Sequence, residues 1–316
     1  MSQIVPNNEI IDVRKVPVGL IINTKARRGQ QFFGQARTVL RAAGVNVVEN
    51  YALTHAKSLP GLVAGMIGRG IKAIILGSGD GTISSIVDHL VNNEVTLGIL
   101  PLGTANDFAR TLDLPLQIEQ ACQVIAEGHT TKIDLGIVNG NYYVNVASVG
   151  FGAAVVEYTS TDAKKILGPL AYPWAAAQAA LSHRPFKVKL GFSNQTIETE
   201  AIHIAVANGR FYGGGVIVAP SARIDDNELI VTIFEPMNPT ELWQVGTHLR
   251  DGQYIRHPKV RTFRQVRRLH LEVLGHRRQS INVDGELSGH TPANFKIAPA
   301  ALKVFVPMSY GKACLE

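Results

Sequence analysis

Short apolar runs alternate with helical patterns through the N-terminal part of the chain, and this alternation limits the possible folds more than any other feature. Four runs have the character of buried strands, at residues 16–22, 45–53, 71–76 and 97–100. Helical patterns separate them at residues 30–43, 56–68 and 83–91, and further helices extend to about residue 127. Strands that alternate with helices form a parallel sheet that is covered on both faces. The sequence therefore predicts a three-layer α/β domain over residues 12–135.

The pattern changes after residue 128, where strands follow one another with few helices between them. Expected strands lie at residues 132–138, 142–149, 186–192, 198–207, 229–234, 268–273 and 280–283. Helical stretches are expected near residues 163–182 and 239–249. Strand-rich sequence with frequent turn signals predicts a β-rich C-terminal domain, which we place at residues 136–300.

Composition excludes several classes of protein. Of the 316 residues, 46% are apolar and 18% are charged, which is enough apolar sequence to build a sizeable core. No apolar run reaches the roughly 18 residues that a membrane span requires. The two cysteines, Cys122 and Cys314, match no zinc spacing and cannot form a disulfide framework. These features predict a cytoplasmic protein.

The positive charge is concentrated late in the chain. The formal net charge is +6, and residues 250–278 hold nine lysines and arginines against two acidic residues. A solvated surface is one interpretation of such a stretch, and an anionic partner surface is the other. On the second interpretation the protein attaches peripherally to the inner face of the membrane, through acidic lipids. We expect no nucleic-acid partner, and no protein partner is evident.

A glycine-rich loop follows the third predicted strand. It consists of Gly77, Ser78, Gly79, Asp80, Gly81 and Thr82, and a helix is expected directly after it. Glycines let backbone N–H groups approach an anion closely, and the start of a helix adds further donors. Asp80 would repel a phosphate directly, so we expect it to act through Mg²⁺ or to position a hydroxyl. A tight turn without any ligand is the alternative, since the loop has neither the P-loop ending nor the last glycine of the dinucleotide pattern.

A second loop follows the fourth predicted strand, at residues 101–110, and contains Gly103 and Thr104. Open α/β sheets bind ligands at the carboxyl ends of their strands, where both loops are expected. Asn23 and Thr54 end the first two strands at the same edge, although each by itself is more often a cap or turn residue. Together these residues predict one nucleotide site.

With these two loops, the chain resembles the diacylglycerol kinase catalytic-domain family, and especially the soluble bacterial lipid kinases of the YegS type. The resemblance runs from about Gly19 to Pro307. It covers the loop at 77–82, the segments at 97–110, 134–136, 145–152, 208–210, 213–215 and 219–226, and the Asp-Gly-Glu motif at 284–286. The chain departs from the family pattern in four places: Ser78 and Asn227 each replace a glycine, Ser85 replaces a glutamate, and Asn23-Thr24-Lys25 replaces the commoner Asn-Pro motif after the first strand.

The resemblance implies a two-domain kinase. The first domain would bind ATP and Mg²⁺. The second domain, a β-sandwich, would help to shape a lipid cleft, and residues 301–316 would return to the first domain. Asp284 would be the general base, with the carboxylate of Glu286 nearby, although Asp-Gly is also a common hairpin turn. Asp134 is expected in the same cleft. A structural Mg²⁺ would be bound by the side chain of Asp226 and the carbonyl oxygens of Arg223 and Glu228, where a solvated turn is the alternative.

The resulting prediction is an ATP- and Mg²⁺-dependent lipid kinase. Diacylglycerol, phosphatidylglycerol and sphingoid lipids all remain open as acceptors. A nicotinamide-nucleotide or sugar-phosphate kinase is the alternative enzyme, because those enzymes also use Gly-Gly-Asp-Gly loops. A non-catalytic lipid-binding relative is the alternative from another class, and Ser85 is the residue that supports it.

Overall fold

The structure is a computed structural model that describes residues 9–24, 29–91, 93–150, 184–275 and 278–311. The chain divides into two compact units. The first consists of Met1–Leu135, Ile224–Asp226 and Ala298–Glu316, and the second of Gly136–Arg223 and Asn227–Ile297. Each unit has its own buried core.

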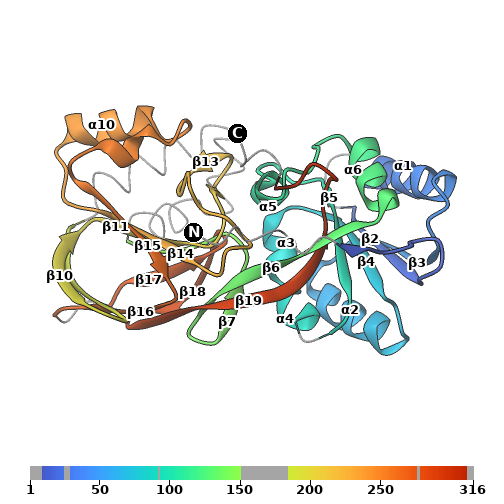
Figure 1. Cartoon of the computed structure of the whole chain (residues 1–316), viewed down its shortest axis with the longest axis horizontal. Coiled ribbons are helices and arrows are strands. Elements are labelled where there is room, and N and C mark those ends of the chain that lie inside the picture. Colours follow the sequence, from blue (N-terminus) through green and yellow to red (C-terminus); the bar gives the residue numbers. More distant parts are fainter. Residues whose placement is uncertain (1–8, 25–28, 92, 151–183, 276–277, 312–316) are drawn as a thin grey trace. The chain divides into compact units, whose positions relative to one another are not determined.

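A parallel sheet forms the centre of the first unit (Figure 1). Its strands are β2 (Val18–Asn23), β3 (Val47–Leu53), β4 (Ala73–Ser78) and β5 (Thr96–Pro101). Their order is β3-β2-β4-β5, and the last residues of β19 (Ala293–Phe305) add a parallel partner beside β5. Every residue of β4 and β5 is buried, which explains why these segments are continuously apolar in sequence.

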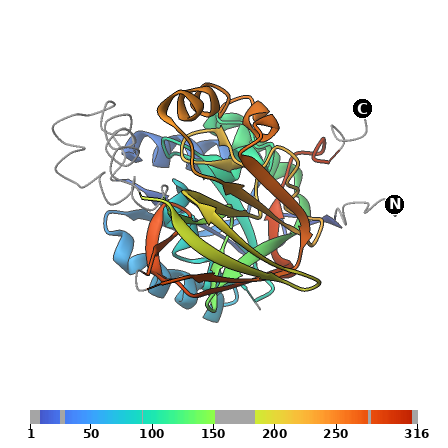
Figure 2. The same ribbon diagram turned by 90° about the vertical axis from the view of Figure 1, so that its left-hand side faces the viewer.

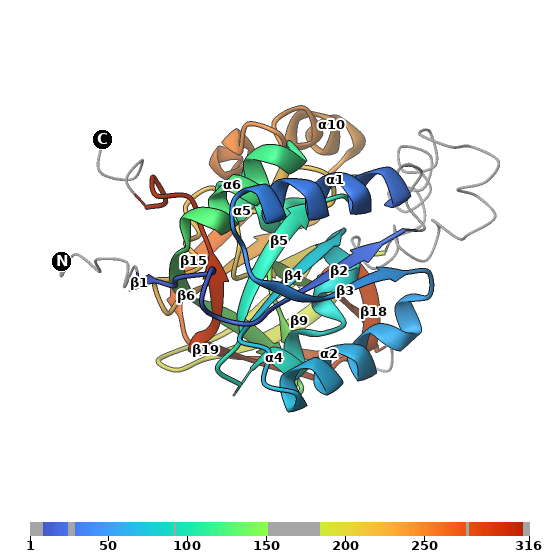
Figure 3. The ribbon, with the colours of Figure 1, turned by 90° about the vertical axis from the view of Figure 1, so that its right-hand side faces the viewer.

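Helices cover both faces of this sheet (Figure 3). One face carries α1 (Gly29–Ala42) and α6 (Ile118–Glu127), and the other carries α2 (Leu59–Gly68) and α4 (Val87–Leu90). Two short helices, α3 (Asp80–Ser84) and α5 (Asp107–Thr111), follow β4 and β5, and the 3₁₀ turn η1 (Ala56–Ser58) precedes α2. The single helix expected at residues 83–91 is therefore wrong, because two short helices replace it. The hydroxyl of Ser85 bonds the carbonyl of Thr82 at 2.7 Å, a local bond that competes with helix continuation.

The second unit is a sandwich of antiparallel strands. One layer has the order β10 (Thr196–Ala201), β9 (Phe186–Phe192), β16 (Arg268–Val273) and the start of β19. The other layer has the order β15 (Val260–Val266), β14 (Leu229–Phe234), β11 (His203–Ala207), β8 (Val146–Gly150), β17 (Ser280–Val283) and β18 (Glu286–His290). An α/β domain followed by a β-sandwich is the fold class predicted from the sequence, and the prediction is confirmed.

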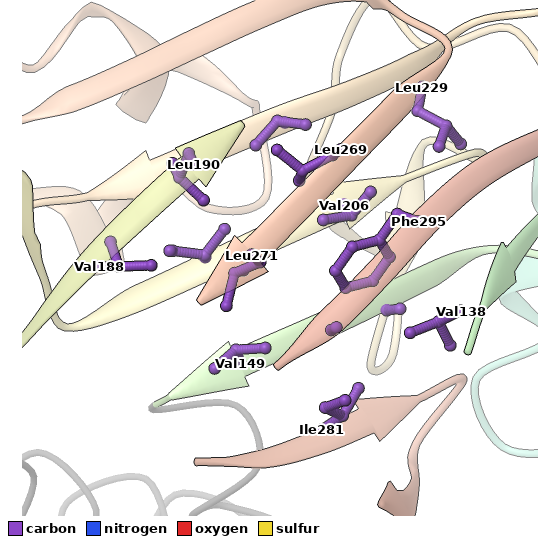
Figure 4. Close-up of a cluster of buried hydrophobic side chains, with 14 of the residues drawn as sticks. Val138, Val149, Val188, Leu190, Val206, Leu229, Leu269, Leu271, Ile281 and Phe295 are labelled. Atoms are coloured by element: carbon purple, nitrogen blue, oxygen red, sulfur yellow. The ribbon is translucent and has the colours of Figure 1, made fainter. Parts of the chain in front are cut away.

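Alternation along the strands builds the sandwich core. In β9 the side chains of Phe186, Val188 and Leu190 are buried while their neighbours are exposed. They pack with Leu271 and Phe295 of their own layer, and this cluster includes residues of the facing layer such as Val206, Leu229 and Ile281 (Figure 4). The apolar face of each strand therefore fixes its register in the sheet.

The remaining elements complete both units. Strand β1 (Glu9–Ile10) pairs with β6 (His129–Val138), and β6 pairs with β7 (Asn141–Tyr143). In the second unit β12 (Phe211–Tyr212) pairs with β13 (Val216–Ile217), and the 3₁₀ turn η3 (Gln253–Arg256) follows α10 (Pro239–Thr247). Figure 2 shows α10 at the outer edge of the second unit. The helix expected at residues 163–182 lies outside the described residues.

Two features bear on the wider expectations. No helix in the described part of the chain is long and apolar enough to cross a membrane. The sequence interpretation missed β15, β18 and β19. Strand β18 is mostly exposed and so lacks an apolar pattern, whereas β19 is interrupted by Pro299.

Candidate functional site

The two glycine loops are joined where β4 and β5 end. Ser78 and Pro101 pair as the last residues of the two strands, and the N–H of Leu102 donates to the carbonyl of Ser78 at 3.1 Å. The hydrogen bonding between β4 and β5 therefore continues for one residue past the end of β5. As a result, the loop at 77–82 and the loop at 101–106 start side by side, as predicted from the sequence.

Gly79 and Gly103 bring the two loops into backbone contact. A Cβ atom added to Gly103 would lie 2.5 Å from the Cα of Gly79, and one added to Gly79 would lie 3.2 Å from the Cα of Gly103. A distance of 2.5 Å between two carbons is far below van der Waals contact, and the obstacle is backbone that cannot rotate away. The close approach of the loops therefore requires glycine at position 103 and leaves little room for a side chain at position 79, which the sequence alone did not reveal.

The carboxylate of Asp80 provides a third connection between the loops. Its two oxygens accept hydrogen bonds from the N–H groups of Asp107, at 3.1 Å, and Phe108, at 2.9 Å. A carboxylate at the start of a helix satisfies orphan N–H donors and interacts favourably with the helix dipole. Asp80 therefore anchors α5 to the first loop. About two of its four lone-pair sites remain for another ligand.

Asn106 holds the second loop in shape, and the sequence interpretation missed it. Its backbone is left-handed, with φ of 52°, a conformation that asparagine tolerates better than most residues. Its side-chain oxygen accepts from the N–H of Gly103 at 2.8 Å, and its amide donates to the carbonyl of Gly103 at 3.0 Å. The signal that could have identified it is an asparagine between a glycine-threonine pair and a helix start.

The other predicted nucleotide-site residues lie along the same carboxyl edge of the sheet. Asn23 ends β2, directly after the residue that pairs with Gly77, and Thr54 follows β3. The Thr54 hydroxyl lies 2.9 Å from Nδ1 of His55, and Thr104 is exposed on the second loop. Ser78 is buried and donates to the carbonyl of Gly79. Gly81 and Thr82 belong to α3.

Asp284 occupies the turn of the β17–β18 hairpin in the second unit. Val283 pairs with Glu286, so Asp284 and Gly285 form a two-residue turn, with φ of 47° and 93°. Positive φ at both positions is the signature of a type I′ turn, for which Asp-Gly is a preferred pair. The hairpin interpretation of this motif is therefore correct, and the side chain of Asp284 is buried.

Three backbone donors hold the Asp284 carboxylate. It accepts hydrogen bonds from the N–H groups of Val144 at 2.8 Å, Asn145 at 2.9 Å and Val146 at 3.1 Å. The side chain is buried, with 9% of the residue exposed. Such donors fix the orientation of a carboxylate and stabilise its ionised form. The segment 144–146 thus forms a rigid cradle for Asp284.

Tyr143 lies beside this cradle and was not anticipated. Burial, and secondarily the charge of Asp284, raise the pKa of the Tyr143 phenol well above its ordinary value. Its ring covers Gly136, where any Cβ atom would lie 2.0 Å from the ring, and its hydroxyl has no hydrogen-bond partner among the described residues. The Tyr143 side chain is therefore buried and uncharged, next to the residues that bind the Asp284 carboxylate.

Asp134 has a structural contact of its own in the first unit. It is buried in β6, its carboxylate accepts from the N–H of Ala300 at 2.7 Å, and its own N–H donates to the carbonyl of Ile224 at 2.7 Å. Ala300 has φ of 48°, so this bond secures an unfavourable backbone conformation in β19. Asp284 belongs to the second unit, and Asp134 to the first.

The predicted metal ligands surround a turn at residues 224–227. Asp226 is half-buried, Arg223 and Glu228 flank the turn, and Asn227 has φ of 60°, which confirms that it tolerates the left-handed conformation of the glycine it replaces. No group of three or more acidic, histidine or cysteine side chains gathers among the described residues. A cation here would depend on backbone oxygens and water around one carboxylate, a donor set that suits Mg²⁺.

A surface cavity also occurs in the second unit, with a volume of about 320 Å³. Its lining includes Pro220, Thr232, Ile255 and Arg264, and none of the predicted site residues contributes to it.

Comparison with known families identifies the chain. The diacylglycerol kinase catalytic domain matches residues 17–138, and the YegS C-terminal NAD kinase beta sandwich-like domain matches residues 145–306. The chain belongs to the diacylglycerol kinase family. This membership confirms both the resemblance described above and the prediction that the protein is a lipid kinase.

Curated relatives and solved structures agree with this assignment. The diacylglycerol kinase of Staphylococcus haemolyticus is 32% identical over 76% of this chain and 72% of its own length. That of Staphylococcus saprophyticus is 31% identical over 74% and 76%, respectively. The crystal structure of a diacylglycerol kinase from Bacillus anthracis superposes with a TM-score of 0.72 at 22% identity, over 93% of this chain and 98% of that one. A second structure from the same strain reaches 0.80 at 23% identity, over 97% and 99% of the two chains. The last two comparisons concern the fold.

Proposed function

We propose that this lipid kinase transfers the γ-phosphate of ATP to a hydroxyl of a membrane lipid, with Asp284 as the general base. The observation that carries the proposal is the cradle of three N–H groups around Asp284 in a chain that also carries the family's joined glycine loops. A base must be oriented toward the hydroxyl it deprotonates, and a fixed carboxylate meets that requirement.

The nucleotide would bind at the carboxyl edge of the parallel sheet. No hydrogen bond within the described residues engages the N–H groups of Gly79, Asp80 and Gly81, so they are available for phosphate oxygens. The N–H groups at the start of α5 are taken by Asp80, so we assign them no phosphate. Asn23, Thr54 and Thr104 complete the proposed site along the same edge.

The transfer step would proceed by displacement at the γ-phosphorus. The lipid hydroxyl oxygen forms a bond to phosphorus, the bond to the bridging oxygen of ADP breaks, and the hydroxyl proton passes to Asp284. Three N–H donors hold the Asp284 carboxylate in place. Such positioning matters because phosphoryl transfer depends mainly on positioning and charge stabilisation. Mg²⁺ bound with ATP would neutralise charge on the phosphates. We propose Asp80 as a residue near that ion, and Asp226 with the carbonyls of Arg223 and Glu228 as the holders of a structural ion.

Diacylglycerol is the first acceptor to test, since the curated relatives carry that name. Phosphatidylglycerol and sphingoid lipids offer a comparable hydroxyl next to long chains. We further propose that the enzyme works in the cytoplasm, attached peripherally to the inner face of the membrane. The excess of basic residues at 250–278 supports this location.

Ser85 is the residue that supports the non-catalytic alternative. Ser85 replaces a glutamate of the family pattern, but its hydroxyl bonds the carbonyl of Thr82 and so stabilises the end of α3.

The test is a transfer assay with ATP labelled at the γ-phosphate, Mg²⁺ and a panel of lipids in mixed micelles. We expect the label to enter the organic extract with one of the three lipid classes, and to do so far less with Asp284→Asn. Label that remains in the aqueous phase, on a nicotinamide nucleotide or a sugar phosphate, would support the alternative kinases. Binding of ATP without turnover on any acceptor would support the non-catalytic alternative.

A further inference from the structure

The helix α10 presents a large apolar side chain directly to solvent. Trp243 is 74% exposed, while Val245, two residues later on the opposite side of the helix, is buried against Phe234 and Tyr254. The orientation of the helix is fixed, because Asn238 and Glu241 form a reciprocal capping box at its start. Trp243 is therefore held away from the core by the same packing that buries Val245.

A second exposed apolar residue lies in the turn that follows. Ile255 in η3 is 39% exposed, and η3 packs against α10. Figures 1 and 2 show α10 at one outer edge of the second unit. Moving the side chains of Trp243 and Ile255 from water into an apolar phase would lower their free energy.

The charges around these two residues leave positive charge uncompensated. Two acidic residues near them are paired with a cation: Glu235 with Arg261 at 3.4 Å and Glu241 with Lys259 at 2.8 Å. Asp251 contacts His248 at 3.2 Å, a partner that is charged only when it is protonated. The Lys259 contact lowers the pKa of Glu241, so this pair is charged at neutral pH.

Two exposed arginines in the same region have no such partner. Neither Arg250 nor Arg256 forms an ion pair within the part of the chain that the structure describes. The remaining charge of this surface is therefore positive.

We propose that α10 and η3 form a docking surface for an anionic lipid bilayer, in which Trp243 and Ile255 enter the interface and Arg250 and Arg256 bind lipid phosphates. Tryptophan is favoured at the boundary between headgroups and acyl chains, where its ring is apolar and its N–H can still reach water. Basic residues near an anionic bilayer add attraction of their own. A nucleic acid would use the arginines but would gain nothing from Ile255.

This surface is narrower than the basic stretch in the sequence. Arg268 lies on β16, in the other layer of the sandwich from β15, and Arg261 is already paired. Residues 250–278 therefore do not form one continuous basic face. The inference adds to the proposed function the part of the enzyme that contacts the membrane, and it can fail independently.

The first test measures binding to vesicles without ATP, by sedimentation, on phosphatidylcholine alone and on an equimolar mixture with phosphatidylglycerol. We expect Arg256→Glu to weaken binding to the anionic vesicles by roughly thirtyfold at low salt, and Trp243→Ala by about tenfold. Matched controls are Lys72→Glu, an exposed charge in the first unit, and Ile10→Ala, a residue that is 71% exposed. Both controls should bind like the wild type.

The second test reports on Trp243 itself. The chain has two tryptophans, so Trp174→Phe leaves Trp243 as the single fluorophore. Anionic vesicles should shift its emission to shorter wavelength, and brominated acyl chains should quench it. Unchanged emission, together with unchanged vesicle binding of Trp243→Ala and Arg256→Glu, would overturn the proposal and assign the surface to another partner. If binding follows this surface but no lipid is phosphorylated in micelles, the docking surface stands and the proposed function fails.

Discussion

At the scale of single residues, Asp284 is both a turn residue and the proposed general base. The Asp-Gly turn requires left-handed backbone, which places the side chain where the N–H groups of Val144, Asn145 and Val146 can reach it. The same geometry that explains a common hairpin motif therefore also supplies an oriented carboxylate. The role of Asp284 in the turn is therefore compatible with its proposed role as the base.

Replacing Asp284 with asparagine tests its role as the base. We expect kcat to fall by about 10²–10⁴-fold, because the amide cannot accept the lipid proton, while the Kd for ATP stays unchanged. The control is Glu286→Gln, an exposed carboxylate two residues away, which should keep wild-type kcat. A steady-state assay with separate nucleotide titration distinguishes the two. A kcat within a few-fold of wild type in Asp284→Asn would transfer the role to Glu286.

Asp80 calls for a pair of substitutions, because it has a structural contact with α5 and a proposed role near the metal. Asp80→Ala removes the cap of α5 and should cost about 0.5–2 kcal/mol of stability, measured by urea unfolding. Asp80→Asn keeps a cap acceptor and should recover most of that stability. If Asp80 also acts near Mg²⁺, turnover stays low in both variants. Recovery of activity together with stability in Asp80→Asn would show that Asp80 is only an anchor.

At the scale of elements, the proposed nucleotide site depends on how closely two loops can approach each other. Gly79 and Gly103 meet backbone to backbone, and the Asp80 carboxylate then fastens the start of α5 to the first loop. The short helices α3 and α5 follow directly after the two loops. The loops therefore behave as one unit, and a change in either should affect the other.

A methyl group between the loops should separate them. Gly103→Ala would place a Cβ atom 2.5 Å from the Cα of Gly79, so we expect at least about tenfold weaker ATP binding in a folded protein. Gly61→Ala in α2 is the matched control, because its Cβ meets nothing within 4 Å, and alanine should stabilise the helix by up to about 1 kcal/mol. Isothermal titration with ATP measures both. Equal affinity in the two variants would contradict the close approach of the loops.

At the scale of the whole molecule, the chain passes four times between its two units, because residues 224–226 also belong to the first. Strand β6 leaves the first unit, and β19 returns to it, where Lys303 and Val304 pair with Thr96 and Leu97 of β5. Phe305 then enters the core of the first unit and is fully buried. The first unit is therefore incomplete until the end of the chain has been added to its sheet.

Phe305→Ala measures how much this return contributes. Loss of a buried phenylalanine should cost about 3–5 kcal/mol in the free energy of unfolding. Met308→Ala, three residues later and 59% exposed, is the control and should change stability by no more than about 0.5 kcal/mol. Urea unfolding followed by circular dichroism gives both values. A similar small loss in the two variants would mean that the end of β19 does not stabilise the first unit.

Elements whose signals are local could be predicted from the amino-acid sequence. The strands that became β2, β4 and β5 are buried on both sides, so their apolar runs can be read without knowing their partners. The glycine loop, the second loop and the Asp-Gly turn are likewise defined by neighbours in the chain. Asn23, Thr54 and the two loops share one sheet edge because parallel strands place all their carboxyl ends together.

The groups that these residues contact became known only from the folded structure. Asp284 finds its donors 138 to 140 residues earlier in the chain, and Asp80 finds its donors 27 and 28 residues later. The pairing of Gly79 with Gly103, the exposure of Trp243 and the return of β19 depend on packing in the same way. Such contacts join segments that leave no periodic trace in the sequence, because a hydrogen bond or a close approach requires only that the folded backbone bring two atoms together.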